Sequence, residues 1–161
     1  MTKYPSQNKV SRVALDIFRL QKPTLSPKES LKTGQPALVK RLDRLSNYFL
    51  VPIYDNIGLC GIIQLEAQNL SLETLSVIQN SSSMFLATED SVLGAVQTTF
   101  PKLYGWRKPF LAWQPCRESF DSTRPLWVVP HSNGQVYVTQ DCQVFETLTA
   151  GRGGTPRPAE Y

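Results

Sequence analysis

Apolar residues recur at helical spacing in two stretches of the chain, and short strand-like segments follow each of them. Around residues 9–20 and 89–100, apolar side chains return at every third or fourth position, which is typical of an amphipathic helix. After each stretch the spacing changes to alternation or to short apolar runs bounded by turn residues, which is typical of strands. The sequence therefore predicts an α+β fold in which each helix crosses a curved antiparallel sheet.

The first half of the chain predicts one helix and three strands. The helix is capped by Ser6 or Asn8, and Pro23 prevents its continuation because proline has no N–H to donate. Residues 21–37 are rich in proline and polar residues and are predicted to be a surface connection. The predicted strands are 38–45, 48–54 and 59–67. Residues 55–58 form a predicted hairpin turn, whereas 70–78 are compatible with either a strand or a short helix.

The second half repeats this order of elements. Thr88 is the expected N-cap of the helix, Glu89 and Asp90 complement the helix dipole, and Pro101 ends the helix. The turn at 131–134 is expected to join two strands. The predicted strands are 109–114, 125–130, 135–139 and 144–148.

These parallels predict two similar α-β-β-β lobes, residues 1–80 and 81–150, followed by a Gly/Pro-rich tail at 151–161. The two halves share few identical residues, so a chance similarity is the alternative. The composition of the tail favours an unstructured end over a docking segment.

Residues 88–148 resemble a PepSY-type unit, a small α-β-β-β module related in shape to the cystatin fold. The resemblance is carried by the Thr-Glu-Asp opening, by the helix that ends in Phe100 and Pro101, and by the segment 135–138 followed by Asp141. Cys142 departs from the pattern, because a glycine is usual there, and the loop 115–124 is longer than the module needs. The resemblance implies a non-catalytic module that binds or inhibits other proteins.

Composition and charge indicate the cellular location and the contacts that we expect for this chain. The 161 residues contain no apolar run of the ~18 residues that span a bilayer, and the N-terminus lacks the apolar core of a signal peptide, so we expect a cytoplasmic protein without membrane insertion. Residues 1–44 hold ten basic and three acidic side chains, whereas 45–101 hold five acidic and no basic ones. We expect these segments to lie together and neutralise one another, although a partner surface is the alternative.

The sequence offers no familiar catalytic or cofactor motif, so we expect neither a cofactor nor a metal site. Cys60, Cys116 and Cys142 match no paired zinc or redox spacing. His131 with Cys116 or Cys142 is the one pair suited to nucleophilic catalysis, but a turn histidine needs no such explanation.

Tryptophan and arginine gather in the second half, and both residue types are enriched at the energetic centres of protein interfaces. The candidate partner-binding residues are Trp106, Arg107, Arg117 and Arg124. Strand alternation is expected to bury at least one of Trp113 and Trp127. We do not expect nucleic acid as a partner, because an acidic residue interrupts the basic face of the first helix.

The sequence thus favours a non-catalytic protein-binding or inhibitory module that acts through an exposed sheet edge or the loop 115–124, with Trp106 as its apolar anchor. Two alternatives stay open: a structural subunit of a larger assembly, and a small cysteine-dependent enzyme. The oligomeric state is not determined by the sequence.

Overall fold

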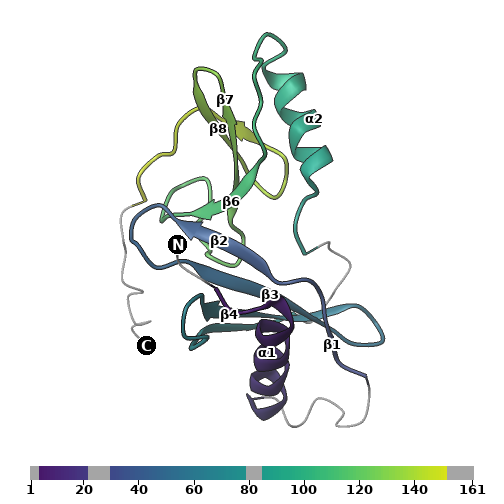
Figure 1. Cartoon of the computed structure of the whole chain (residues 1–161). Coiled ribbons are helices and arrows are strands. Elements are labelled where there is room, and N and C mark those ends of the chain that lie inside the picture. The colour runs from purple at the N-terminus through teal and green to yellow at the C-terminus, as the bar shows by residue number, and fades with distance from the viewer. Residues whose placement is uncertain (1–3, 22–29, 79–84, 152–161) are drawn as a thin grey trace, which may run out of the picture. The chain divides into compact units, whose positions relative to one another are not determined.

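A computed structural model describes residues 4–21, 30–78 and 85–151 of the chain. Within these residues the fold is mixed α+β, with two helices and nine strands. The chain divides into two compact units, Met1–Ala87 and Thr88–Tyr161, each of which has its own helix followed by its own antiparallel strands (Figure 1). Neither described helix is long and apolar enough to cross a membrane.

The first unit contains helix α1 and strands β1 to β5. Their bounds are α1 Gln7–Gln21, β1 Lys32–Thr33, β2 Ala37–Arg41, β3 Tyr48–Tyr54, β4 Leu59–Glu66 and β5 Leu72–Val77. All pairings are antiparallel, and β4 lies between β3 and β5. The two short strands β1 and β2 pair with successive parts of the other edge of β3. Helix α1 packs mainly against β1, β3 and β4.

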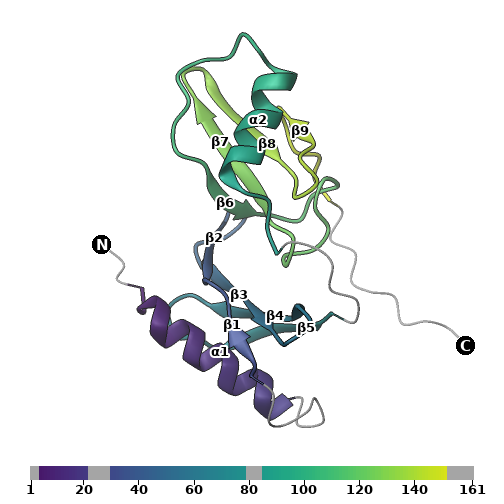
Figure 2. The same cartoon turned by 90° about the vertical axis from the view of Figure 1, so that its right-hand side faces the viewer.

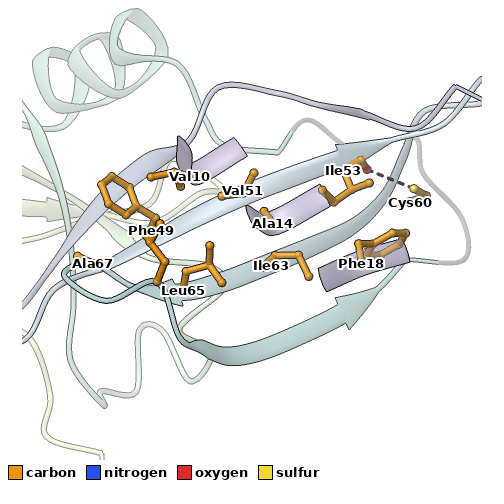
Figure 3. Packing of buried hydrophobic residues seen from close by; sticks show 11 residues of the cluster. Val10, Ala14, Phe18, Phe49, Val51, Ile53, Cys60, Ile63, Leu65 and Ala67 are labelled. Atoms are coloured by element: carbon orange, nitrogen blue, oxygen red, sulfur yellow. Dashed lines mark hydrogen bonds between the residues drawn. The ribbon is translucent and has the colours of Figure 1, made fainter. Parts of the chain in front are cut away.

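The core of this unit lies between α1 and the sheet. Val10, Ala14 and Phe18 recur at every fourth position, so they share one helix face, and all three are fully buried. They pack against alternate side chains of two central strands (Figure 3). The strand residues of this core are Phe49, Val51, Ile53, Cys60, Ile63 and Leu65.

A partly buried ion pair lies on the other face of the same sheet. The guanidinium of Arg41 donates to the carboxylate of Glu73, which also accepts a 2.8 Å hydrogen bond from Nε2 of Gln64. Arg41 also lies over the ring of Tyr48, 4.6 Å from its centroid. This ion pair joins one residue of the basic segment 1–44 to one residue of the acidic segment 45–101.

The second unit contains helix α2 and strands β6 to β9. Their bounds are α2 Glu89–Thr99, β6 Phe110–Trp113, β7 Leu126–His131, β8 Gly134–Val138 and β9 Val144–Phe145. The four strands pair antiparallel in chain order. Helix α2 packs against β8 and β9 (Figure 2). Thr88 caps α2 by accepting a hydrogen bond from the backbone N–H of Ser91, as predicted.

The structure corrects some predicted boundaries. The strand predicted at 38–45 ends at Arg41, because the chain bends there and leaves Leu45 fully exposed. The predicted connection at 21–37 contains the short strand β1, and the undecided segment 70–78 forms strand β5. The strand predicted at 144–148 stops at Phe145. Residues 152–161 of the predicted tail lie outside the described residues.

Candidate functional site

The loop between β6 and β7 has a shape fixed by its own polar groups. The hydroxyl of Ser119 donates to the backbone oxygen of Arg124 at 2.6 Å. The carboxylate of Asp121 accepts a hydrogen bond from the backbone N–H of Thr123 at 2.8 Å. The backbone oxygen of Asp121 accepts a second one from the backbone N–H of Arg124 at 2.9 Å. Asp and Ser side chains stabilise turns in this way because they reach nearby backbone groups. The loop 115–124 is therefore a preorganised surface.

The start of this loop is also joined to the end of the described chain. The backbone N–H of Arg117 donates to the backbone oxygen of Thr149 at 3.0 Å, and the backbone N–H of Gly151 donates to the backbone oxygen of Pro115 at 3.3 Å. In return, the backbone N–H of Thr149 donates to the carboxylate of Glu118 at 3.0 and 3.1 Å. These bonds surround a short antiparallel bridge between Cys116 and Ala150, which fixes the start of the loop.

The hydrogen bonds to Glu118 affect its ionisation. Partial burial raises the pKa of its carboxyl group, but the hydrogen bonds from Thr149 and from its own backbone outweigh that effect and hold the pKa below its ordinary value. Glu118 is therefore negatively charged at neutral pH.

A pocket of about 280 Å³ lies between this loop and the turn that follows β8. Its walls carry three carboxylates and one guanidinium, and Arg124 pairs with Asp141 across it at 2.9 Å. The lining residues are Glu118, Ser119, Phe120, Asp121, Arg124, Thr139, Gln140, Asp141 and Gln143. This volume falls just below the usual range for small-molecule sites, so it suits a side chain better than a large cofactor. We call this site the loop pocket.

Phe120 stands at the rim of the loop pocket with 82% of its surface exposed. An exposed aromatic ring on an ordered loop offers a large apolar contact surface. Phe120 was not among the candidate residues predicted from the sequence. Its signal was present, since it is the one large apolar residue among the polar residues of the loop 117–124.

The turn beneath the pocket holds a residue in an unusual conformation. Cys142 has a φ of 61°, in the left-handed region that favours glycine. The backbone N–H of Cys142 donates to the backbone oxygen of Thr139 at 2.9 Å, and the backbone N–H of Thr139 donates to the backbone oxygen of Gln143.

The four predicted partner-binding residues do not form one patch. Arg124 lines the loop pocket, and Arg117 is exposed on the same loop. Trp106 and Arg107 lie at the far end of β7, where the backbone N–H of Arg107 donates to Pro130. Five strand steps of ~3.3 Å separate the two ends of β7, or roughly 17 Å.

Trp106 is also less exposed than an apolar anchor for a partner should be. Its ring packs edge-on against His131, 5.7 Å between centroids, and it is only partly exposed. Trp113 and Trp127 are both buried, at 8% exposure each, in agreement with the expected burial of at least one of them.

The thiols and the imidazole are not brought together. Cys116 and Cys142 lie at the end of the sheet where β7 begins, whereas His131 lies where β7 ends. Burial raises the pKa of the Cys116 thiol, which opposes formation of the reactive thiolate. Within the described residues, no group of three or more His, Cys, Asp or Glu side chains is placed to hold a metal ion.

Comparison with known proteins found no match for this chain among family models, curated proteins or solved structures.

Proposed function

We propose that this chain is a non-catalytic protein-binding module that docks its partner on the loop pocket and on Phe120. The observation that carries the proposal is Phe120 itself, a large aromatic side chain with 82% exposure beside a pocket of about 280 Å³. Aromatic side chains that enter a partner's surface supply much of the binding energy of protein interfaces.

The charge of the pocket defines the chemistry of the partner. Glu118, Asp121 and Asp141 outnumber the single cation Arg124, so the lining carries a net negative charge. A complementary surface presents lysine or arginine side chains to the pocket and an apolar recess to Phe120. Because the loop is already ordered, docking costs little conformational entropy.

The order of elements in each unit leads to a second part of the proposal. Each unit has a helix followed by antiparallel strands, and we propose that the two units are copies of an α-β-β-β module of PepSY type. In this interpretation the long loop 115–124 is an addition to the module, and an added loop on a fixed scaffold is a common location for binding residues. We place the protein in the cytoplasm, where its free cysteines would stay reduced.

The test compares Phe120 with an exposed aromatic residue elsewhere in the same unit. Tyr104 is 69% exposed and lies at the far end of β7, near Ser132. A photoreactive phenylalanine analogue at position 120 or 104 is expressed in the native host, and cross-linked proteins are identified by mass spectrometry. We expect a specific adduct at position 120 and none at position 104.

The identified partner is then purified, and calorimetry measures its affinity for the native chain and for the Phe120→Ala and Tyr104→Ala variants. We expect Phe120→Ala to weaken binding at least about tenfold, which corresponds to about 1.4 kcal/mol, and Tyr104→Ala to leave it unchanged. Equal cross-linking at both positions, or unchanged affinity of Phe120→Ala, would exclude this surface.

A subunit of a larger assembly is the second candidate function, and one observation favours it. Strand β5 is the outer strand of the first unit's sheet, and Leu72 and Val77 on it are 40% and 39% exposed. Exposed apolar strand edges are sites at which chains associate.

A further inference from the structure

The outer edge of β5 presents backbone groups that have no partner strand within the described residues. The backbone N–H of Ile78 donates to Cys60 of β4, and Ser76 and Thr74 face β4 at the next alternate positions. Because an antiparallel ladder uses alternate residues, Leu75 and Val77 direct their N–H and C=O groups away from β4. These two residues therefore offer two donors and two acceptors to another strand.

An apolar row accompanies these backbone groups. Leu72, Leu75 and Val77 pair in register with Leu65, Ile63 and Gly61 of β4, so their side chains lie on the sheet face that packs against α1. Leu65 and Ile63 are fully buried, whereas the row on β5 is only partly covered. A strand added beside β5 would cover this row.

The edge lacks the charges that usually prevent association. Soluble proteins protect edge strands with lysine, proline or inward-pointing charges. In β5 the one charged residue is Glu73, and Arg41 and Gln64 of the same unit already bind its carboxylate. The remaining residues of β5 are uncharged, so a second strand meets no electrostatic barrier.

We propose that β5 is a dimerisation edge, at which two copies of this chain pair their β5 strands antiparallel about a twofold axis at Ser76. This register places Leu75 opposite the partner's Val77 and the partner's Leu75 opposite Val77, so the outward N–H and C=O groups of both residues find partners. The apolar rows of the two copies then meet, and the two Glu73 carboxylates are already neutralised by Arg41. This self-complementarity favours a second copy over an unrelated strand, and it is independent of the loop pocket.

The register makes a cross-linking prediction. Ser76 lies directly opposite its own copy in a pair without hydrogen bonds, where Cα atoms are ~4.5 Å apart, a distance that a disulfide spans. We expect Ser76→Cys to form a disulfide-linked dimer under mild oxidation. The matched control is Thr74→Cys, whose side chain lies two positions from the axis on the same sheet face and should not link to its copy.

A backbone test separates pairing from folding. The N–H of Val77 points outward, so Val77→Pro removes a donor to the second copy without removing a hydrogen bond to β4. We expect sedimentation to show a concentration-dependent dimer for the native chain and at least tenfold weaker dimerisation for Val77→Pro, with unchanged circular dichroism. Val77→Lys should have the same effect through charge, which covers the case in which the proline variant fails to fold.

The proposal is overturned if the native chain sediments as a monomer up to high micromolar concentrations, or if Val77→Lys dimerises as the native chain does. Equal cross-linking of Ser76→Cys and Thr74→Cys would also contradict the twofold register. A monomer that instead pairs β5 with a different protein would show that the edge serves an unrelated strand. Failure of any of these tests leaves the binding test on Phe120 unaffected.

Discussion

Phe18 of α1 lies against Gly61 of β4 so closely that a Cβ added to Gly61 would stand 2.4 Å from Cε2 of Phe18. The ring is fully buried, and the backbone oxygen of Ser76 lies 3.2 Å from the same position. Glycine in a strand interior weakens the strand, so its presence here reflects the close approach of the helix. The packing of the C-terminal half of α1 against the sheet therefore requires a residue without a side chain at position 61.

We expect Gly61→Ala to destabilise the first unit by about 1–3 kcal/mol, because the buried ring must move to make room. Urea unfolding followed by circular dichroism measures the loss. The double variant Phe18→Leu with Gly61→Ala should recover part of it. An unchanged unfolding midpoint for Gly61→Ala would show that the ring moves freely.

The same substitution in α2 should have the opposite effect. Gly94 is exposed in the middle of the helix, and a Cβ there would meet no atom within 4 Å. Gly94→Ala is expected to stabilise the second unit by about 0.5–1 kcal/mol, because glycine loses more backbone entropy in a helix. All three tryptophans lie in this unit, so tryptophan fluorescence during urea unfolding reports on it. A lower midpoint would contradict this account.

The spacing of apolar residues was sufficient to predict most helices and strands, since these residues recur on the face of each element that is buried. The strand predicted at 48–54 has those bounds, and both helices were placed to within two residues. The undecided segment 70–78 became a strand because β4 supplies a ladder for it, which is a long-range pairing that local spacing does not contain.

The candidate site was predicted only in part. The loop 115–124 was selected because it offers backbone and arginine contacts, and Arg124 lines its pocket. Trp106 was selected because tryptophan is enriched in interfaces, but its contact with His131 depends on register between β7 and the segment before β6. Exposure of a single side chain follows from such tertiary contacts, so composition alone could not rank Trp106 and Phe120.

The ionisation of Glu118 predicts a pH effect on stability. Its pKa is lowered in the fold, so its contribution is present above the ordinary value of ~4.3 and is lost as the pH falls through the lower folded value. Glu118→Gln removes this titration. We expect the stability of the native chain to fall more steeply than that of the variant below about pH 4.5. Parallel acid unfolding curves would contradict a role for Glu118 in fixing the loop.

The thiols should differ in reactivity. Burial raises the pKa of both Cys60 and Cys116, whereas Cys142 is partly exposed in its turn. We therefore expect iodoacetamide at pH 8 to alkylate Cys142 first, with the two buried thiols reacting only on unfolding. Mass spectrometry of a time course gives the order. Fast alkylation of Cys116 in the folded chain would instead support the cysteine-dependent enzyme.

Cys142 provides the most specific test of the turn beneath the loop pocket. Its φ of 61° costs about 1–2 kcal/mol for a residue with a Cβ, whereas glycine adopts this conformation without steric cost. Glycine loses more entropy on folding, so we expect a net stabilisation of about 0.5–1 kcal/mol for Cys142→Gly. Cys142→Ala is the control, because it removes the thiol but keeps the Cβ and should bring no gain. Equal unfolding midpoints for the two variants, measured by tryptophan fluorescence, would show that the turn is not strained.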